Sequence, residues 1–351
     1  MKTLAPWILA AALAVPAAAK PKAPTALAPA VPAVQETPRP DDALEVSIHR
    51  LANGLTVYLS PSKIEPRVSA RIAVRAGSKN DPADSTGMAH YLEHMLFKGT
   101  SRLGTLDYEK ERPHLERIRS LYEDLFKTTD EAGRAKIYKA IDAANITASS
   151  QAVPNEFDRF YKNIGAEGLN AFTSDEQTVY VVSIPANRVE AWARMESERF
   201  KSPVFRLFQT EIETVYEEKN RSLDNAESIV GDEIENRLFK HHPYGQQPTL
   251  GSIEHLKNPS LAKMYAFYDR WYAPNNMAIA LAGDFDRAEM LELIKKSFGA
   301  WTPRPLPALP KWELPKPKGE EKYEVKYEAE QKVALAWLTV AHSHPDADAL
   351  E

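Results

Sequence analysis

Apolar and polar residues alternate where the chain first takes on the composition of a folded protein. Apolar residues occupy every second position on both sides of Asn53-Gly54: Val46, Ile48, Leu55, Val57 and Leu59. This period of two predicts two strands, and Asn-Gly between them predicts a two-residue hairpin turn. The same period over residues 67–76 predicts a third strand with one apolar face.

Longer segments show the helical period instead. Residues 105–153 contain two apolar runs at spacings of three and four, separated by a polar stretch near 128–133. We interpret this segment as an inserted helical hairpin that packs on itself as a surface decoration; a wall beside a cleft is the alternative. Further elements are predicted along the rest of the chain: helices at 189–200, 211–239, 261–271 and 287–298, and a buried strand at 277–282. The pattern predicts an α+β fold, with a mostly antiparallel sheet backed by helices.

The first 43 residues have the composition of a targeting segment followed by a tether. Residues 1–19 combine Lys2 near the start, an apolar core and Ala17-Ala18-Ala19 at the end, which is the pattern of a secretory signal peptide. Because the apolar core is too short for a permanent span, we expect export to the periplasm and no stable membrane span after cleavage. Six prolines among small residues predict that residues 20–43 form a linker.

Composition narrows the possible chemistry. The chain has 351 residues, of which 43% are hydrophobic, and this is enough for a sizeable core. Its net charge of -5, without a long basic run, argues against nucleic acid as a partner. Because the chain has no cysteine, disulfides and thiolate metal sites are excluded. Histidine and carboxylate side chains are then the strong metal ligands that remain.

The segment with the most specific chemistry is His90-Tyr91-Leu92-Glu93-His94. On a helix, His94 lies about 40° round from His90 and Glu93 about 60° to the other side, so the three side chains share one face. Two neutral nitrogen donors one turn apart, beside a carboxylate that can reach a metal-bound water, are what a catalytic zinc site requires. Composition alone gives an expectation of roughly 0.03 for this pattern, so two unrelated surface histidines are the less favoured interpretation.

A pair of glutamates later in the chain has a complementary spacing. Glu211 and Glu218 are seven positions apart, two helical turns, and therefore lie on nearly the same helix face. Val215 and Tyr216 give the same segment an apolar side with which it can dock. The two acids are therefore candidates for the same site as the histidine pair.

With these two motifs the chain resembles the pitrilysin/insulinase family of inverted zinc peptidases (inverzincins), which includes the mitochondrial processing peptidases. The family pattern is H-x-x-E-H followed by E-x-x-x-x-x-x-E. Carried over by position, the resemblance implies one zinc ion per chain and a residue for each role: His90, His94 and Glu218 as zinc ligands, Glu93 as general base and Glu211 as a supporting acid. The gap between the motifs, positions 95–217, is longer than is usual in the family, so Glu217 remains a rival for the third ligand.

Residues 168–174 resemble the N-A-[FY]-T-S stretch of the family, which forms an exposed strand edge near the zinc. The resemblance implies that Asn170, Ala171 and Phe172 bind substrate. An edge strand offers unpaired N–H and C=O groups, so an extended peptide can add to the sheet with little regard for its sequence. A turn that enters a core strand is the alternative interpretation.

The domain organisation follows from composition and from the same resemblance. We expect a zinc-binding peptidase domain over 44–302 and a proline-rich linker over 303–319. Residues 332–343 can be laid on 67–78 with shared apolar character, which suggests that 320–351 begins a second copy of the α/β unit. Because the family is built from such repeats, we expect the second repeat to be incomplete and the chain truncated.

The function that we expect is that of a zinc-dependent endopeptidase acting on extended peptides or unfolded protein segments. Family resemblance implies that two halves close like a clamshell, and that an Arg and a Tyr from the later half help to hold the substrate. The second half is then supplied by downstream sequence or by a partner subunit. A non-catalytic binding or assembly subunit of the same fold is the alternative, and retention of both histidines and both glutamates argues against it.

Overall fold

The computed structural model describes residues 35–38, 41–314, 319–341 and 344–350. The predicted signal peptide, residues 1–19, lies outside the described residues, as does most of the linker that follows it. Within the described part of the chain, none of the helices combines the length and the apolar character needed to cross a membrane.

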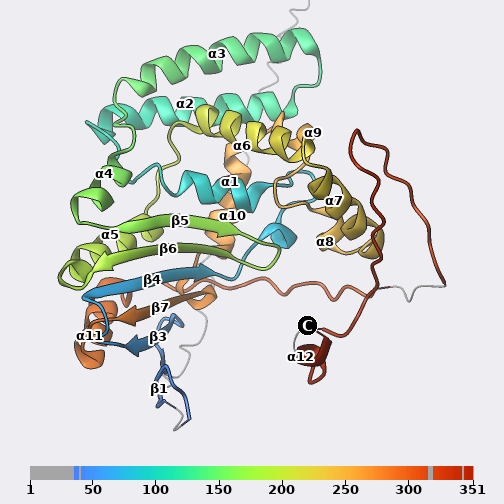
Figure 1. Cartoon of the computed structure of the whole chain (residues 1–351). Helices are drawn as coiled ribbons and strands as arrows, with labels where there is room; N and C mark the ends of the chain where they lie inside the picture. The colour runs from blue at the N-terminus through green and yellow to red at the C-terminus, as the bar shows by residue number, and fades with distance from the viewer. Residues whose placement is uncertain (1–34, 39–40, 315–318, 342–343, 351) are drawn as a thin grey trace, which may run out of the picture.

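A seven-stranded sheet forms one layer of the molecule (Figure 1). Its strands follow one another in space in this order: β1 (Gln35–Glu36), β2 (Ser47–Arg50), β3 (Thr56–Pro61), β7 (Met277–Gly283), β4 (Arg67–Val74), β6 (Thr178–Pro185) and β5 (Glu167–Thr173). β3 and β7 pair in parallel, and the other neighbouring strands pair antiparallel. The predicted α+β class with a mostly antiparallel sheet is confirmed.

One face of the sheet is buried under helices. In the central strand β4, Val68 and Ile72 are buried while Ser69 and Arg71 between them are exposed, as expected for a sheet with one face on the core. Three helices contact the strands of the sheet: α1 (Met88–Met95), α5 (Val189–Lys201) and α11 (Arg287–Phe298). A further helix, α10 (Leu261–Trp271), packs on α1. Side chains from the strands and these helices form one continuous core.

The turn between β2 and β3 is longer than the sequence predicts. Arg50 pairs with Thr56 and the N–H of Leu51 donates to the carbonyl of Leu55 at 2.9 Å, so a loop over 52–54 replaces the expected two-residue turn. The reason lies in Asn53, whose Nδ2 donates hydrogen bonds to the carbonyls of Phe298 and Trp301 at 2.9 and 3.0 Å. Asn53 therefore joins this loop to the end of α11.

The predicted helical hairpin exists, but it does not pack on itself alone. α2 (Tyr108–Lys127) and α3 (Glu131–Ser149) lie antiparallel, and α3 begins within the polar stretch near 128–133. Four side chains of α2 are buried in the common core: Ile118, Leu121, Tyr122 and Leu125. The ring of Tyr122 packs on Phe208 with centroids 4.7 Å apart. The interpretation as a self-packing decoration is wrong, because the apolar side of α2 packs on the common core as well as on α3.

The remaining helices complete the layer above the sheet. They are α4 (Glu156–Asn163), α6 (Phe208–Leu223), α7 (Ala226–Leu238), α8 (Pro243–Gln246) and α9 (Ile253–Leu256). The single helix predicted over 211–239 is two helices, because Asn225 ends the first segment and caps α7 by accepting hydrogen bonds from the N–H groups of Glu227 and Ser228. In Figure 1, α3, α2, α6 and α1 follow one another above β5.

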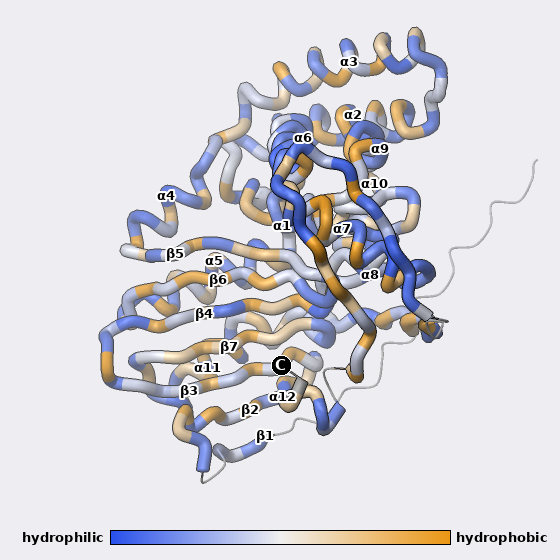
Figure 2. The backbone as a smooth tube through the Cα atoms, turned by 45° about the vertical axis from the view of Figure 1, so that its right-hand side comes forward, coloured by the Kyte–Doolittle hydropathy of each residue, from blue (hydrophilic) through white to orange (hydrophobic). Residues whose placement is uncertain are grey.

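Residues 303–314 and 319–341 contain neither helix nor strand, and a short helix, α12 (Ala347–Leu350), follows. The strand expected over 332–343 is absent from its described part, 332–341, because no neighbouring strand supplies hydrogen bonds to it. Most of its apolar side chains are exposed, with Trp337 at 71%. Figure 2 shows these apolar positions along the segment that crosses in front of α7.

Candidate metal centre

A carboxylate at the N-terminus of α1 holds this helix in place. Asp81 is buried, and its two oxygens accept hydrogen bonds from the N–H groups of Gly87, Met88 and Ala89 at 2.7, 3.1 and 2.9 Å. These N–H groups have no partner within a helix. Gly87 has a φ of +83°, and a Cβ there would lie 2.9 Å from the Cα of Gly251. The position of α1, and of every side chain that it presents, is set at this end.

Three side chains from two helices converge on one point beside α1. The rings of His90 and His94 lie one turn apart, with centroids separated by 4.8 Å. Oε2 of Glu218, from α6, lies 3.5 Å from Nε2 of His90 and 3.6 Å from Nε2 of His94. Donor atoms about 2.0–2.2 Å from a tetrahedral zinc ion are separated by about 3.3–3.6 Å. Both Glu218 distances lie in this range, and one donor atom from each of the three side chains lies within 4.8 Å of the others, so this group could hold a zinc ion.

The docking of α6 selects Glu218 over its neighbour. Phe208 and Val215 on the apolar side of α6 are buried against the core. With this side of α6 on the core, Glu218 faces α1 and forms a possible metal-binding group with the two histidines. Glu217 is exposed and is not part of that group. The spacing of 211 and 218 on one helix face thus corresponds to the face that meets α1.

Glu211 supports the same site from two turns earlier in α6. Its Oε2 lies 3.3 Å from Nδ1 of His94, and its Oε1 forms an ion pair with Lys98. Burial alone raises the pKa of the Glu211 carboxyl, but these two partners outweigh burial and the pKa lies below its ordinary value. An ionised Glu211 accepts the Nδ1 proton of His94, which leaves the lone pair of Nε2 free for a metal ion.

The two histidines differ in their readiness to lose a proton. Burial, together with the neighbouring His94, lowers the pKa of His90 to about 4, so this ring is neutral near pH 7. Burial also acts to lower the pKa of His94, but the hydrogen bond to Glu211 and the nearby carboxylates raise it above its ordinary value. A bound cation would oppose protonation of both rings.

Glu93 lies on the flank of the histidine pair and is held by a residue of β5. Its side chain is 7% exposed, and Oγ1 of Thr173 donates to its Oε2 at 2.6 Å. Burial raises the pKa of Glu93 above its ordinary value, although the Thr173 hydroxyl and His94 act in the opposite direction. A carboxylate with a raised pKa is a better acceptor for the proton of a nearby water.

The predicted substrate-binding residues lie on the strand that ends at Thr173. β5 is the edge of the sheet and pairs with β6 on one side only among the described residues. Asn170 and Phe172 point outward, and Phe172 is 46% exposed, while Ala171 is half-buried. α1 contacts this strand. The structure thus brings the predicted edge next to the metal group.

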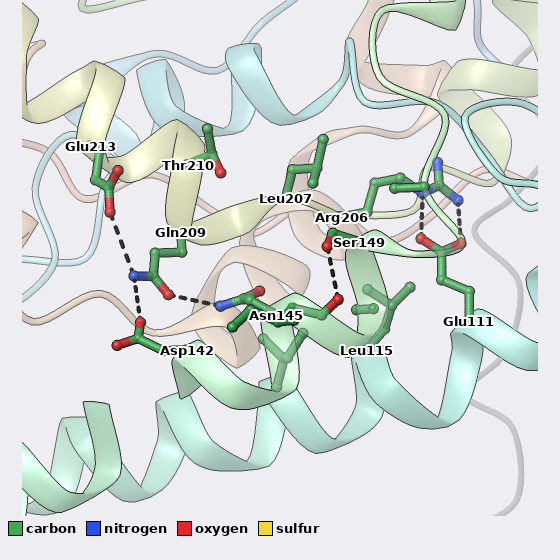
Figure 3. Close-up of a pocket in the computed structure, with 14 residues that line it drawn as sticks. Glu111, Leu115, Asp142, Asn145, Ser149, Arg206, Leu207, Gln209, Thr210 and Glu213 are labelled. Carbon is green, nitrogen blue, oxygen red and sulfur yellow. Dashed lines mark hydrogen bonds and ion pairs between the residues drawn. The ribbon is translucent and has the colours of Figure 1, made fainter. Parts of the chain in front are cut away.

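The inserted hairpin is attached to the first turn of α6, as Figure 3 shows. Nε2 of Gln209 donates to Asp142 at 2.9 Å, and Nδ2 of Asn145 donates to Oε1 of Gln209 at 2.8 Å. Deeper in, Arg206 and Glu111 form a buried ion pair with two hydrogen bonds of 2.9 and 3.1 Å. A cavity of about 280 Å³ lies between these contacts. The hairpin therefore supports the helix that carries Glu211 and Glu218.

Sequence reasoning missed three of these supports. The signal for Thr173 was present, since it belongs to the N-A-F-T-S stretch, but its contact with Glu93 joins residues 80 positions apart. Asp81 gave no local signal for a cap, because it lies six residues before Gly87, the first residue whose N–H it accepts. Arg206 gave no sequence signal, because its partner is 95 positions away.

Two family models match most of this chain. The model of the insulinase family of peptidases, peptidase family M16, matches residues 56–113 and 126–250. The model described as the peptidase M16 inactive domain matches residues 259–351. Together the two matches extend over most of the described residues.

Individual relatives agree with the family models. An uncharacterized zinc protease of Mycobacterium leprae is 27% identical over 252 residues, which are 71% of this chain and 45% of the relative. The crystal structure of a protease from Helicobacter pylori superposes with a TM-score of 0.58 and 23% identity, covering 77% of this chain and 54% of that chain.

The periplasmic protease PqqL from Escherichia coli also has a TM-score of 0.58, with 21% identity, and the match covers 79% of this chain and 26% of that chain. At these identities the solved structures show the fold alone. The chain spans about half the length of the curated relatives that it matches.

Proposed function

Because the chain belongs to the insulinase family of peptidases, family M16, we propose that it is a zinc-dependent endopeptidase that cleaves extended peptides or unfolded protein segments. The observation that carries the proposal is the convergence of His90, His94 and Glu218, with one donor atom from each within 4.8 Å of the others. Glu93 lies beside this group without belonging to it, which is the position required of a general base.

The chemistry follows from the roles of these side chains. A zinc ion bound by the three donors would act as a Lewis acid and lower the pKa of a water molecule in its open position. Glu93 takes the proton of the attacking water and later returns it to the leaving amine. Glu211 keeps His94 in the tautomer and orientation that a metal ligand needs.

Substrate binding is assigned to the edge strand. A peptide in extended conformation pairs with β5 along Asn170, Ala171 and Phe172, and the exposed ring of Phe172 adds apolar contact. The main-chain hydrogen bonds of such pairing do not depend on substrate sequence, which favours unfolded segments over folded proteins. The acidic net charge of the chain makes nucleic acid an unsuitable partner.

Catalysis is proposed to need a second half that closes over the site. The proposed metal ligands all come before residue 219, so metal binding is independent of that half. The match to the inactive-domain model over 259–351, and the coverage of about half of each relative, support a larger enzyme that is completed downstream or by a partner subunit. We assign the exposed segment 332–341 to the start of that second unit.

Export to the periplasm is proposed from two observations. The first 19 residues have the pattern of a secretory signal peptide. PqqL, which has the same fold, is described as a periplasmic protease. Fractionation of cells that produce the full chain, followed by N-terminal sequencing of the mature protein, tests both the cleavage and the compartment.

The test of function compares the purified chain with its Glu93→Gln variant. Metal analysis should give one zinc per chain for both, since the substitution leaves the three ligands in place. Cleavage of an unfolded protein, measured with the second half supplied, should fall by several orders of magnitude in the variant. A parent chain without zinc and without cleavage would favour the alternative, a non-catalytic assembly subunit.

A further inference from the structure

The hydroxyl of Thr173 lies where two parts of the proposed site meet. Thr173 is the last residue of β5, and its Oγ1 donates to Oε2 of Glu93 at 2.6 Å. Among the described residues, the Thr173 hydroxyl is the group that donates a side-chain hydrogen bond to the Glu93 carboxylate. The strand assigned to peptide binding therefore also holds the carboxylate that is assigned as the base.

A second hydroxyl lies behind the first. Thr178 pairs with Thr173 across β5 and β6, and their Oγ1 atoms are 3.3 Å apart. Thr178 is buried and donates its proton to the carbonyl oxygen of Ala76 at 3.0 Å. A hydroxyl has one proton and two lone pairs, so Thr178 in this state can accept from Thr173 but cannot donate to it. The proton of Thr173 thus has two acceptors within reach, the Glu93 carboxylate and the Thr178 oxygen.

This geometry suits both protonation states of Glu93. When Glu93 is ionised, the Thr173 proton points to the carboxylate and forms a short, charge-assisted hydrogen bond. When Glu93 has taken a proton, its own O–H can donate to Oγ1 of Thr173, whose proton then turns to Thr178. The side chain of Glu93 keeps a partner in each state, so it does not have to change its rotamer as the proton moves.

From these contacts we propose that Thr173 is a positioning residue for Glu93, whose hydroxyl holds the carboxylate in the orientation in which it takes and returns a proton. The proposal rests on the proposed function and deepens it. It concerns the orientation of the base and not the binding of metal or peptide, so its effect belongs in kcat and not in KM or zinc content.

Three substitutions test the proposal in the zinc-loaded full chain, with the second half supplied. Thr173→Val removes the hydroxyl at constant shape, and Thr173→Ser restores it. Thr56→Val makes the same exchange on β3, which is separated from β5 by three strands. We expect Thr173→Val to lower kcat by about tenfold to a hundredfold, with KM within twofold and one zinc per chain. Thr173→Ser and Thr56→Val should keep kcat within about threefold of the parent. Unchanged kcat in Thr173→Val, a loss confined to KM, or equal losses in the Val and Ser variants would overturn the proposal.

Thermal unfolding of the chain provides a measurement that does not depend on activity. Thr173→Val should lower the Tm of the parent by about 2 to 4 °C, but should leave the Tm of a Glu93→Met variant within about 1 °C, because the hydrogen bond is already lost there. Equal shifts in both backgrounds would overturn the contact and with it the positioning role. Coupled shifts without any cleavage by the parent would instead overturn the proposed function and leave the contact established.

Discussion

His94 is held by Glu211 on the side of its ring that faces away from the metal group. Nδ1 of His94 lies 3.3 Å from Oε2 of Glu211, while Nε2 of the same ring lies 3.6 Å from Oε2 of Glu218. One helix, α6, therefore presents two carboxylates to the two nitrogens of one imidazole. This arrangement sets the tautomer of the ring before any metal ion binds.

The first prediction concerns this support. Glu211→Ala should weaken zinc binding by about 10- to 100-fold, because His94 loses the acceptor for its Nδ1 proton and Lys98 loses its partner. Glu213→Ala, an exposed acid on the same helix, is the control and should leave the affinity unchanged. Competition with a chromophoric chelator measures both. Equal affinities for the two variants would show that Glu211 has no part in the site.

The second prediction distinguishes the two candidates for the third ligand. A saturating concentration of zinc, about 100 times Kd, should stabilise the parent by about 2.7 kcal/mol and raise its Tm. Glu218→Gln should abolish this increase, whereas Glu217→Gln should keep it, because only Glu218 faces the histidines. Thermal unfolding with zinc and with a chelator decides between them. The reverse pattern would place the ligand at Glu217.

The third prediction concerns the hairpin. Glu111→Leu should lower the free energy of unfolding by about 3 to 5 kcal/mol, because Arg206 is 2% exposed and loses its carboxylate partner. Glu116→Leu removes an exposed carboxylate from the same helix and should change the stability by less than about 1 kcal/mol. Urea denaturation measures the two variants. Arg206 also donates hydrogen bonds to the backbone carbonyls of Lys98, Leu103 and Thr100. A small effect of Glu111→Leu would mean that these carbonyls alone satisfy the Arg206 guanidinium.

The same contacts bear on deletion of residues 105–153. Because this segment contributes Tyr122 and Leu125 to the common core as well as the partner of Arg206, we expect the shortened chain to fail to fold. Circular dichroism of the deletion variant provides the check. A folded, zinc-binding product would restore the interpretation of the hairpin as an independent decoration.

The fourth prediction concerns the cap of α1. Asp81→Ala should destabilise the chain by about 1 to 2 kcal/mol, because the N–H groups of Gly87, Met88 and Ala89 lose their acceptor. Zinc affinity should fall as well, since the first turn of α1 carries His90. Asp84→Ala, three residues later and largely exposed, should leave both quantities unchanged. Equal behaviour of the two variants would contradict the role of Asp81.

The fifth prediction concerns the chain without its second half. The 351-residue chain should bind zinc at normal stoichiometry but be nearly inactive alone. Each missing transition-state hydrogen bond from the later half costs roughly 3 to 4 kcal/mol, or about 100- to 1,000-fold in rate. Cleavage of an unfolded protein, with and without the second half in trans or by extension, measures the difference. Full activity of the chain alone would refute the divided site.

Local patterns in the sequence determined the parts of the structure that depend on neighbours along the chain. The four-residue spacing of His90 and His94, with Glu93 between them, places all three on one helix face wherever that helix lies. Alternation over 67–76 likewise determined which face of β4 is buried. Such patterns hold because the periods of helix and strand are properties of the backbone.

Tertiary structure decided which of those faces meet. Glu218 reaches the histidines only because the apolar side of α6 docks on the core, and Thr173 reaches Glu93 only because β5 lies against α1. The role of the hairpin was decided in the same way, through the pair of Arg206 with Glu111. These contacts join residues 80 to 128 positions apart. No local period specifies them, because they depend on how whole apolar surfaces pack together.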